Sequence, residues 1–353
     1  MANRIDNPTI IALDVTYKCT LRCLHCFNSS GEHKNDVPEL TDEEILKLCD
    51  DIIKFNPTTL CLCGGEALIR KDLLYKVIKK VRTGTKKRTS INMVSNGELL
   101  TSEVAKNLKE SGIGLVQISL DGATHETHDW LRGKKGAFDN AIQAIKNLRN
   151  NNVSTAVSCT PTKKNINEYS NALELCESLG VESFRAQPLM LMGRAAKNLQ
   201  DYVPTYLDYM KIRKVFNNHL NKNDSTIITE WGDPIEHLTS ATMDGDRDNI
   251  SINIDAYGNI EISPYIPIRI GNIRKYSLLD YWDNGLDKIW SVPFVKELCK
   301  KINSADDMEL NNLYSYMPKN FIDNQLYIDL IDTKDFKSLT LEDILNEGSV
   351  KCV

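Results

Sequence analysis

The sequence predicts an α/β protein built on a parallel sheet, followed by a smaller α+β region. From residue 10 to about residue 190, short apolar runs alternate with amphipathic stretches in units of about 30 residues, as in βα repeats. Unusual polar residues gather just after the apolar runs, at the edge where parallel α/β folds place ligands. After residue 249, the pattern changes to the alternation of a β-hairpin.

Strands and helices are predicted in turn along the first half of the chain. The apolar runs that predict strands are residues 9–14, 58–63, 90–94, 114–120, 153–158 and 183–187. Helical periodicity between them covers residues 42–55, 70–82, 101–111, 137–151 and 167–179. Thr41 and Glu44 form a capping box at the start of the first helix. Six parallel strands fit either a doubly wound sheet or a partial barrel, and periodicity alone does not choose between them.

The second half of the chain is less regular. Residues 204–222 predict a helix, and the polar stretch 229–249, with Asp244-Gly-Asp-Arg-Asp248, predicts a loop. Alternating apolar residues on either side of Tyr257-Gly-Asn259 predict a hairpin, whereas residues 302–335 are too weakly patterned for a prediction. We therefore expect three parts, at residues 1–200, 201–248 and 249–353, of which the second is a helical linker.

Composition excludes several classes of protein. The 353 residues carry a net charge of −5 with 26% charged and 41% hydrophobic residues, which fits a globular protein and not a nucleic-acid-binding surface. No apolar run approaches the ~18 residues that span a membrane, and the N-terminus has no signal peptide, so we expect a cytoplasmic protein without membrane contact. In that compartment, clustered cysteines among the ten present indicate metal or redox chemistry.

Three cysteines follow the first predicted strand within eight residues. Cys19, Cys23 and Cys26 stand in the order C-x3-C-x2-C. Three converging thiolates can hold a soft metal or an iron–sulfur cluster and leave one position open for a substrate or cofactor. A structural zinc site is the alternative, but the second pair of ligands that it needs is missing at matching spacing.

This loop, directly after the first strand of a βα series, resembles the radical S-adenosylmethionine (radical SAM) superfamily. The resemblance implies a partial (β/α)6 barrel of the TIM type and one [4Fe–4S] cluster held by Cys19, Cys23 and Cys26. It also implies that S-adenosylmethionine (SAM) chelates the fourth iron. His25 stands at the bulky position before the third cysteine and is expected near the cofactor.

The next strand ends in a segment that resembles the GGEP motif of this family. Gly64 and Gly65 let the backbone approach a cofactor closely, and the carboxylate of Glu66 suits the SAM ammonium group. Ala67 replaces the proline of the motif.

Later strand ends resemble further parts of the SAM site. The resemblance implies that Ser119 and Asp121 bind the ribose or the amino acid part of SAM, and that Arg132 meets its carboxylate. Met190 resembles a residue beside adenine, although a core role is equally compatible with it. The resemblance also implies that Ser95 and Asn96, at the end of the third predicted strand, line the SAM pocket.

The resemblance implies reductive cleavage of SAM to a 5′-deoxyadenosyl radical, which then takes a hydrogen atom from the substrate. The C-terminal part resembles the SPASM or twitch extension, whose subgroup is rich in enzymes that modify ribosomally made peptides. Cysteines expected near Ser263 and Tyr265 are missing, so we expect this domain to hold no cluster. A precursor peptide is the expected substrate, with epimerisation or cross-linking as the outcome.

The expected partners follow from this hypothesis. A flavodoxin- or ferredoxin-type protein would supply electrons. Only eight residues precede the first predicted strand, so we expect no N-terminal peptide-recognition domain. A separate recognition protein, the C-terminal domain or the barrel mouth would then recruit the peptide.

The sequence indicates the roles of the remaining cysteines and histidines less specifically. Cys61 and Cys63 alternate with leucines and could face the barrel interior, but structural thiols are the more common case. Cys159 and Cys352 are candidate hydrogen-atom donors to a substrate radical. His125 and His128 are expected at the surface or in a helix cap.

Two other functions stay open from the sequence. A radical SAM enzyme could instead act on a small molecule such as a sugar or a cofactor precursor. An electron-transfer iron–sulfur module could use the same cysteine loop, but it would not need Glu66, Asp121 or Arg132.

Overall fold

The computed structural model describes residues 7–346, except for residues 35, 223–225, 234, 241–247, 304–306 and 308–325. The described strands form one sheet in the order β11-β10-β9-β8-β1-β2-β3-β4-β5-β6-β7. Its curved part is a partial barrel, because β1 to β7 are parallel neighbours in chain order. These strands are β1 Ile10–Asp14, β2 Thr59–Cys63, β3 Ser90–Ser95, β4 Leu115–Ser119, β5 Ser154–Cys159, β6 Ser183–Ala186 and β7 Ile228–Trp231. The predicted α/β class with a TIM-type parallel barrel is confirmed.

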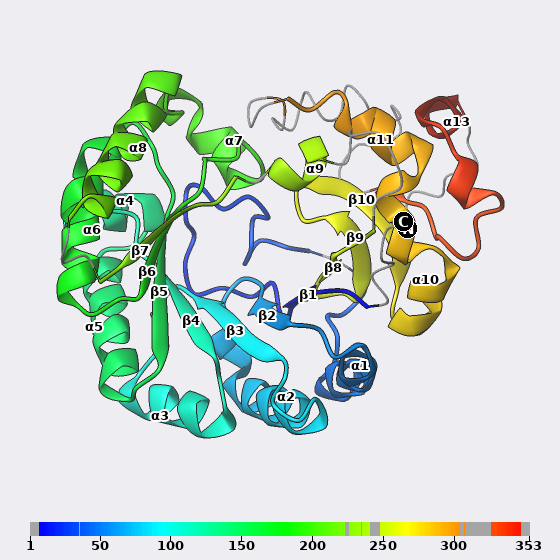
Figure 1. The fold of residues 1–353 in the computed structure, drawn as a ribbon, viewed down its shortest axis with the longest axis horizontal. Coiled ribbons are helices and arrows are strands. Elements are labelled where there is room, and N and C mark those ends of the chain that lie inside the picture. Colours follow the sequence, from blue (N-terminus) through cyan, green and yellow to red (C-terminus); the bar gives the residue numbers. More distant parts are fainter. Residues whose placement is uncertain are drawn as a thin grey trace.

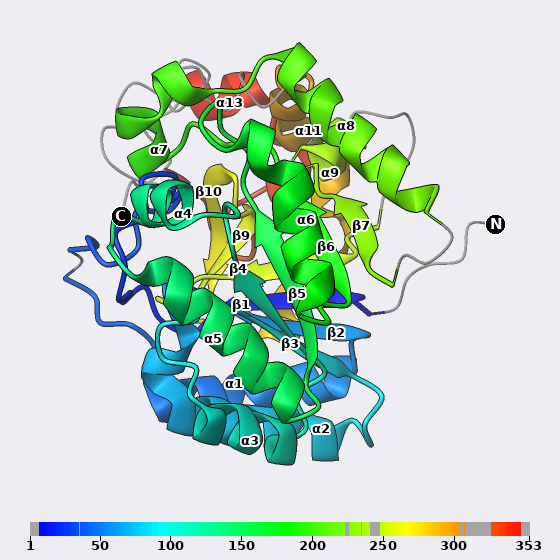
Figure 2. The same ribbon diagram turned by 90° about the vertical axis from the view of Figure 1, so that its left-hand side faces the viewer.

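Helices cover the outer face of the barrel (Figure 1). Figure 2 shows α5 and α6 lying over β4 to β6. Helices α1, α2, α3 and α5 turn an apolar stripe to the sheet, and the capping box of Thr41 and Glu44 is present at α1. The helices of the barrel are α1 Asp42–Phe55, α2 Lys71–Gly84, α3 Ser102–Ser111, α4 His125–Arg132, α5 Ala137–Asn150, α6 Tyr169–Ser178, α7 Arg194–Asn198, α8 Tyr206–Leu220 and α9 Glu236–Ser240.

Four barrel elements were not predicted: β7, α4, α7 and α9. The prediction of a loop over residues 229–249 is wrong at its start, because Ile228–Trp231 forms β7 and pairs with β6, while α9 lies further along. β7 is an edge strand, and the side chains at both of its ends are exposed. Its sequence therefore lacks a clear alternation of apolar and polar residues. The polar helix α4 was also missed. Of the predicted loop 244–248, residues 244–247 lie outside the described residues.

The C-terminal strands continue the barrel sheet. β8 (Ser251–Ile254) pairs in parallel with β1 on the side opposite β2. The predicted hairpin is confirmed, since β8 pairs antiparallel with β9 (Asn259–Ser263). The remaining elements are β10 Ile266–Asn272, α10 Leu278–Asn284, α11 Pro293–Cys299, β11 Leu326–Tyr327 and α13 Leu341–Asn346. The domain boundaries at residues 200 and 248 stay a prediction.

The core lies between the sheet and its helices. Along β2, Leu60 and Leu62 are fully buried against the helices, whereas Cys61 and Cys63 point to the other face. The loop between β1 and α1 lies inside the curve of the sheet (Figure 1). Within the described residues, no helix has the length and apolarity needed to cross a bilayer.

Candidate active site

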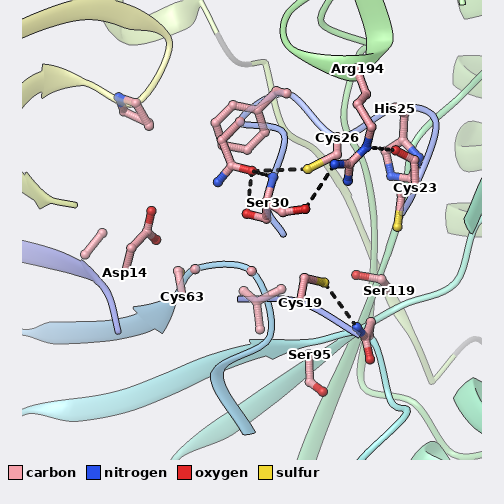
Figure 3. A pocket seen from close by; sticks show the side chains of 18 of the residues that line it. Asp14, Cys19, Cys23, His25, Cys26, Ser30, Cys63, Ser95, Ser119 and Arg194 are labelled. Atoms are coloured by element: carbon pink, nitrogen blue, oxygen red, sulfur yellow. Dashed lines mark hydrogen bonds between the residues drawn. The ribbon is translucent and has the colours of Figure 1, made fainter. Parts of the chain in front are cut away.

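The three loop cysteines line one cavity of about 360 Å³ at the carboxyl edge of the parallel strands. Figure 3 shows Cys19, Cys23 and Cys26 around this cavity, with Ser119 beside Cys19, Ser95 below them, and Asp14 and Cys63 on the left-hand side. The parallel register brings these side chains together, since β1 to β4 all end at the same edge.

Arg194 fixes the cysteine loop from the segment that follows β6. Its Nε donates to the Cys23 carbonyl at 2.9 Å, and its Nη1 donates to the Ser30 carbonyl at 3.0 Å. The Arg194 amide donates to the Cys26 carbonyl at 2.9 Å. Gly193 makes this approach possible, because a Cβ there would lie 2.3 Å from the Phe27 carbonyl oxygen.

The thiols surround a space instead of meeting at one point. In the described part of the chain, no three His, Cys, Asp or Glu side chains are placed to hold a single metal ion. A four-iron cluster makes a different demand, since each cysteine thiolate binds its own iron. Burial raises the pKa of the Cys23 thiol to about 11, and the Arg132 guanidinium, with Nη1 3.7 Å from Cys23 Sγ, favours the thiolate. Three thiols on one cavity wall, with a cation beside the most buried of them, fit such a cluster.

The two glycines after β2 pack against the start of the cysteine loop. A Cβ on Gly64 would lie 2.3 Å from the Thr16 carbonyl oxygen, and one on Gly65 would lie 2.4 Å from that of Lys18. The Gly65 amide donates to the Thr16 carbonyl at 2.7 Å. Both glycines line the cavity, so here their backbone forms part of its wall.

Glu66 lies behind that wall and does not line the cavity. Its buried carboxylate accepts from the Asn96 amide at 2.8 Å, the Ser95 hydroxyl at 3.0 Å and the Leu68 amide at 3.1 Å. Burial raises its pKa, against these hydrogen bonds. Glu66 thus supports Ser95 and Asn96, which do line the cavity, whereas its expected contact with an ammonium group stays a prediction.

Asp121 also lies behind the site and positions Arg132. The Asp121 Oδ2 atom lies 2.6 Å from Arg132 Nη2, and Oδ1 accepts from the Thr160 amide at 2.9 Å. Burial would raise the pKa of Asp121, but Arg132 and the neighbouring histidines lower it. Arg132 and Ser119 line the cavity directly, so they remain candidates to contact SAM.

The two nearby histidines differ in burial. His25 lines the cavity with its Nε2 3.7 Å from Asp121 Oδ2. The expectation of a surface or cap position is wrong for His128, which is fully buried and accepts from the Asp121 amide at 3.0 Å through Nδ1. Burial lowers the pKa of His128 to about 4. His125 is exposed, as expected, and contacts Asp139 at 2.8 Å.

Two further candidates among the described residues lie away from the cavity. Met190 is buried in the main core, and Gln187 and Arg194 from the same segment line the cavity instead. Cys159 is buried in the core as well, where β5 turns its thiol away from the cavity, so packing replaces its expected role as a hydrogen-atom donor. Cys352 lies outside the described residues.

Sequence reasoning missed the wall opposite the cysteine loop. Asp14 lies there, and burial and the charge of Asp255 raise its pKa to about 7. Tyr265, between β9 and β10, accepts from Gln187 Nε2 at 2.8 Å and closes the cavity from the C-terminal side. The position of Asp14 at a strand end was the available signal, since the same signal identified Ser119. The other lining residues on this side are Asn253, Ile254, Glu261 and Pro264.

Comparisons with known proteins agree with this geometry. The family model of the radical SAM superfamily matches residues 13–176. The AdoMet-dependent heme synthase of Oleidesulfovibrio alaskensis is 30% identical over 295 residues, which cover 77% of this chain and 74% of the relative. Mycofactocin maturase MftC of Mycolicibacterium smegmatis is 28% identical over 298 residues, covering 81% of this chain and 71% of the relative.

A solved structure shares the fold beyond the barrel. Streptococcus suis SuiB bound to S-adenosylmethionine superposes with a TM-score of 0.66 at 14% identity, covering 85% of this chain and 76% of SuiB. SuiB has also been solved with its precursor peptide SuiA. At this identity, the likeness establishes the fold alone.

Proposed function

Because this chain belongs to the radical SAM superfamily, we propose that its cavity is where a hydrogen atom is taken from a ribosomally synthesised precursor peptide. Members of the superfamily are enzymes that use a [4Fe–4S] cluster and SAM. The proposal adds the substrate class and the roles of individual residues.

The residues present fit both cofactors. Cys19, Cys23 and Cys26 would hold the cluster, and Gly64, Gly65, Ser95, Asn96, Ser119 and Arg132 would surround SAM. Bound there, the reduced cluster and SAM supply a 5′-deoxyadenosyl radical.

The chain itself positions these groups and excludes water. Arg132 has its guanidinium held by Asp121, which suits a bidentate contact with a carboxylate. Glu66 fixes the backbone amide of Asn96 from behind, and Arg194 fixes the cysteine loop. Tyr265 and Gln187 close the cavity, and a closed cavity protects a reactive intermediate from side reactions.

The proposal that the substrate is a peptide rests on the size of the cavity. At about 360 Å³, it lies near the lower end of the range for one drug-sized ligand, so the cluster and SAM together would fill it. A single peptide side chain entering from the mouth needs little further space, whereas a heme-sized macrocycle needs far more. The similarity to MftC and the fold shared with SuiB support the same substrate class.

The first experiment tests the reaction class. The protein is reconstituted anaerobically with iron and sulfide, iron per chain is counted, and 5′-deoxyadenosine is measured by mass spectrometry after dithionite and SAM are added. We expect about four irons and deoxyadenosine that is lost in the Cys19/Cys23/Cys26→Ala variant. Four irons without deoxyadenosine would favour an electron-transfer module, and eight would show a second cluster.

The second experiment tests the substrate class. The enzyme is co-expressed with each small open reading frame beside its gene, and the peptide products are weighed by mass spectrometry. A mass change or an altered residue that depends on Cys23 supports a peptide substrate. Unchanged peptides, together with deoxyadenosine formation driven by a cell extract freed of peptides, would favour a small-molecule substrate, as the similarity to a heme synthase allows.

A further inference from the structure

Two thiols outside the cysteine loop lie together on the inner face of β2. Cys61 and Cys63 alternate with buried leucines, and their Sγ atoms are 3.2 Å apart. Cys63 lines the same cavity as the loop cysteines, opposite Arg194 (Figure 3). The site described above gives neither thiol a role.

The two thiols are not equivalent. A hydrogen bond from Cys63 lowers the pKa of Cys61, and the same contact, together with burial, raises the pKa of Cys63. The carboxylate of Asp14 acts on both thiols and disfavours a second negative charge. Cys63 therefore keeps its S–H bond, and Cys61 is the thiol that loses a proton first.

The other described thiols cannot take this place. Outside the cysteine loop, they are buried in the hydrophobic core and absent from the cavity wall; they are Cys49, Cys159, Cys176 and Cys299. Cys63 is thus the described thiol that reaches the cavity without belonging to the cysteine loop.

We propose that Cys63 donates a hydrogen atom to a carbon radical formed in the cavity, and that Cys61 is its redox partner. The inference rests on the proposed function, which supplies the radical. An S–H bond is weaker than an aliphatic C–H bond, so the transfer runs downhill from sulfur to carbon.

The step balances in atoms and electrons. The Cys63 S–H bond breaks homolytically and a C–H bond forms on the radical, which leaves one unpaired electron on Cys63 Sγ. Cys61 gives its proton to solvent, and its thiolate bonds to Cys63 Sγ. The surplus electron passes to an oxidised iron–sulfur centre. Two thiols thereby become one disulfide, with one electron leaving in the hydrogen atom and one to the iron–sulfur centre.

The strand permits this bond. Residues two apart on a strand have Cα atoms about 6.6 Å apart, which lies within the range of disulfides, about 4.4–6.8 Å. The Sγ atoms lie on one face, 3.2 Å apart, and would have to approach to about 2.05 Å to form the bond.

The first test uses solvent deuterium. Reconstituted enzyme, freed of added thiols, is given SAM and titanium(III) citrate in D2O without any substrate, and the deuterium content of each deoxyadenosine is measured. Thiol hydrogens exchange with solvent and carbon-bound hydrogens do not, so the wild type is expected to label deoxyadenosine. Cys63→Ser should lose the label, whereas Cys61→Ser and Cys159→Ala should keep it. Equal labelling in wild type and Cys63→Ser overturns the proposal.

The second test reads the thiols themselves. Trypsin releases residues 55–70 as one peptide that contains Cys61 and Cys63 and no other cysteine. After the same reaction, we expect this peptide to lose two hydrogens in the wild type but not in Cys61→Ser. The apoprotein treated with diamide should show the same mass loss. A peptide that stays reduced in both treatments contradicts the proposal.

The outcomes separate the two hypotheses. A wild type that forms no deoxyadenosine refutes the proposed function, whatever the thiols do. Deoxyadenosine without a Cys63-dependent label leaves the proposed function standing and refutes only the role of the thiol pair.

Discussion

The Arg132 guanidinium lies 2.6 Å from the Asp121 carboxylate and also faces the thiol of Cys23, with Nη1 3.7 Å from Sγ. Helix α4 produces this arrangement, because His128 and Arg132 stand one turn apart on it. His128 accepts from the Asp121 amide while Arg132 pairs with the Asp121 carboxylate. One turn of α4 therefore binds both the backbone amide and the carboxylate of Asp121, and it places the Arg132 guanidinium beside the cysteine loop.

Removing the charge of Asp121 should destabilise the fold and loosen Arg132. Asp121→Asn leaves a buried guanidinium without its anion, and breaking a buried ion pair in this way costs about 3 kcal/mol. Urea unfolding of the apoprotein measures the loss. Glu126→Gln, which changes an exposed acid of helix α4, is the control and should cost less than about 1 kcal/mol. Equal costs in the two variants would show that the ion pair adds nothing to stability.

Gly193→Ala should displace the cysteine loop. The added Cβ would lie 2.3 Å from the Phe27 carbonyl oxygen and 2.7 Å from that of Cys26, so the backbone between these residues must move. We expect fewer irons bound per chain after reconstitution. Gly136→Ala is a matched control, because Gly136 also has a positive φ, +85°, but nothing lies within 4 Å of an added Cβ. Iron content equal to that of the control would mean that the loop tolerates the contact.

Because of His128, the free energy of unfolding should decrease as the pH falls. Its pKa is about 4 in the folded protein, below its ordinary value of 6.5, so the unfolded chain binds the extra proton first and stability is lost as pH falls below 6.5. From pH 7 to pH 5, the loss from this group is about 2 kcal/mol. Asp14 acts in the opposite direction, because its raised pKa stabilises the fold as pH falls below about 7.

A variant separates the contribution of His128 from that of Asp14. His128→Asn keeps an acceptor for the Asp121 amide but cannot titrate. Relative to wild type, its free energy of unfolding should therefore improve by about 2 kcal/mol between pH 7 and pH 5. His125→Asn, on the exposed face of the same helix, is the matched control. A difference from wild type that does not change with pH would contradict the assignment.

Much of the site was predictable because it depends on local spacing and parallel strands. Cys19, Cys23 and Cys26 follow β1, and Gly64 and Gly65 follow β2, so parallel pairing brings them to the same edge. Which side chains face the cavity was not predictable for residues beyond the strand ends. The carboxylates of Glu66 and Asp121 turn away from the cavity because backbone amides and Arg132 bind them there.

The elements that sequence reasoning missed depend on tertiary contacts. Helix α4 is mostly polar, and its buried face rests on Leu131 and on hydrogen-bonded polar residues such as His128, so apolar periodicity does not reveal it. Strand β7 is held by pairing with β6 and by few buried side chains. The parallel pairing of β8 with β1 joins residues more than two hundred positions apart, which no local pattern encodes.

Glu66→Gln should lower both the stability of the protein and its affinity for SAM, although Glu66 does not line the cavity. Three donors, from Leu68, Ser95 and Asn96, face the two oxygens of the carboxylate, and an amide nitrogen would face one of them. A buried donor left without an acceptor costs about 1–3 kcal/mol. We therefore expect this loss in urea unfolding, together with weaker SAM binding by the reconstituted enzyme, since Asn96 lines the cavity. Glu103→Gln, at an exposed position in α3, should change neither quantity. SAM affinity that stays at the wild-type level in a destabilised Glu66→Gln variant would confine Glu66 to a role in folding.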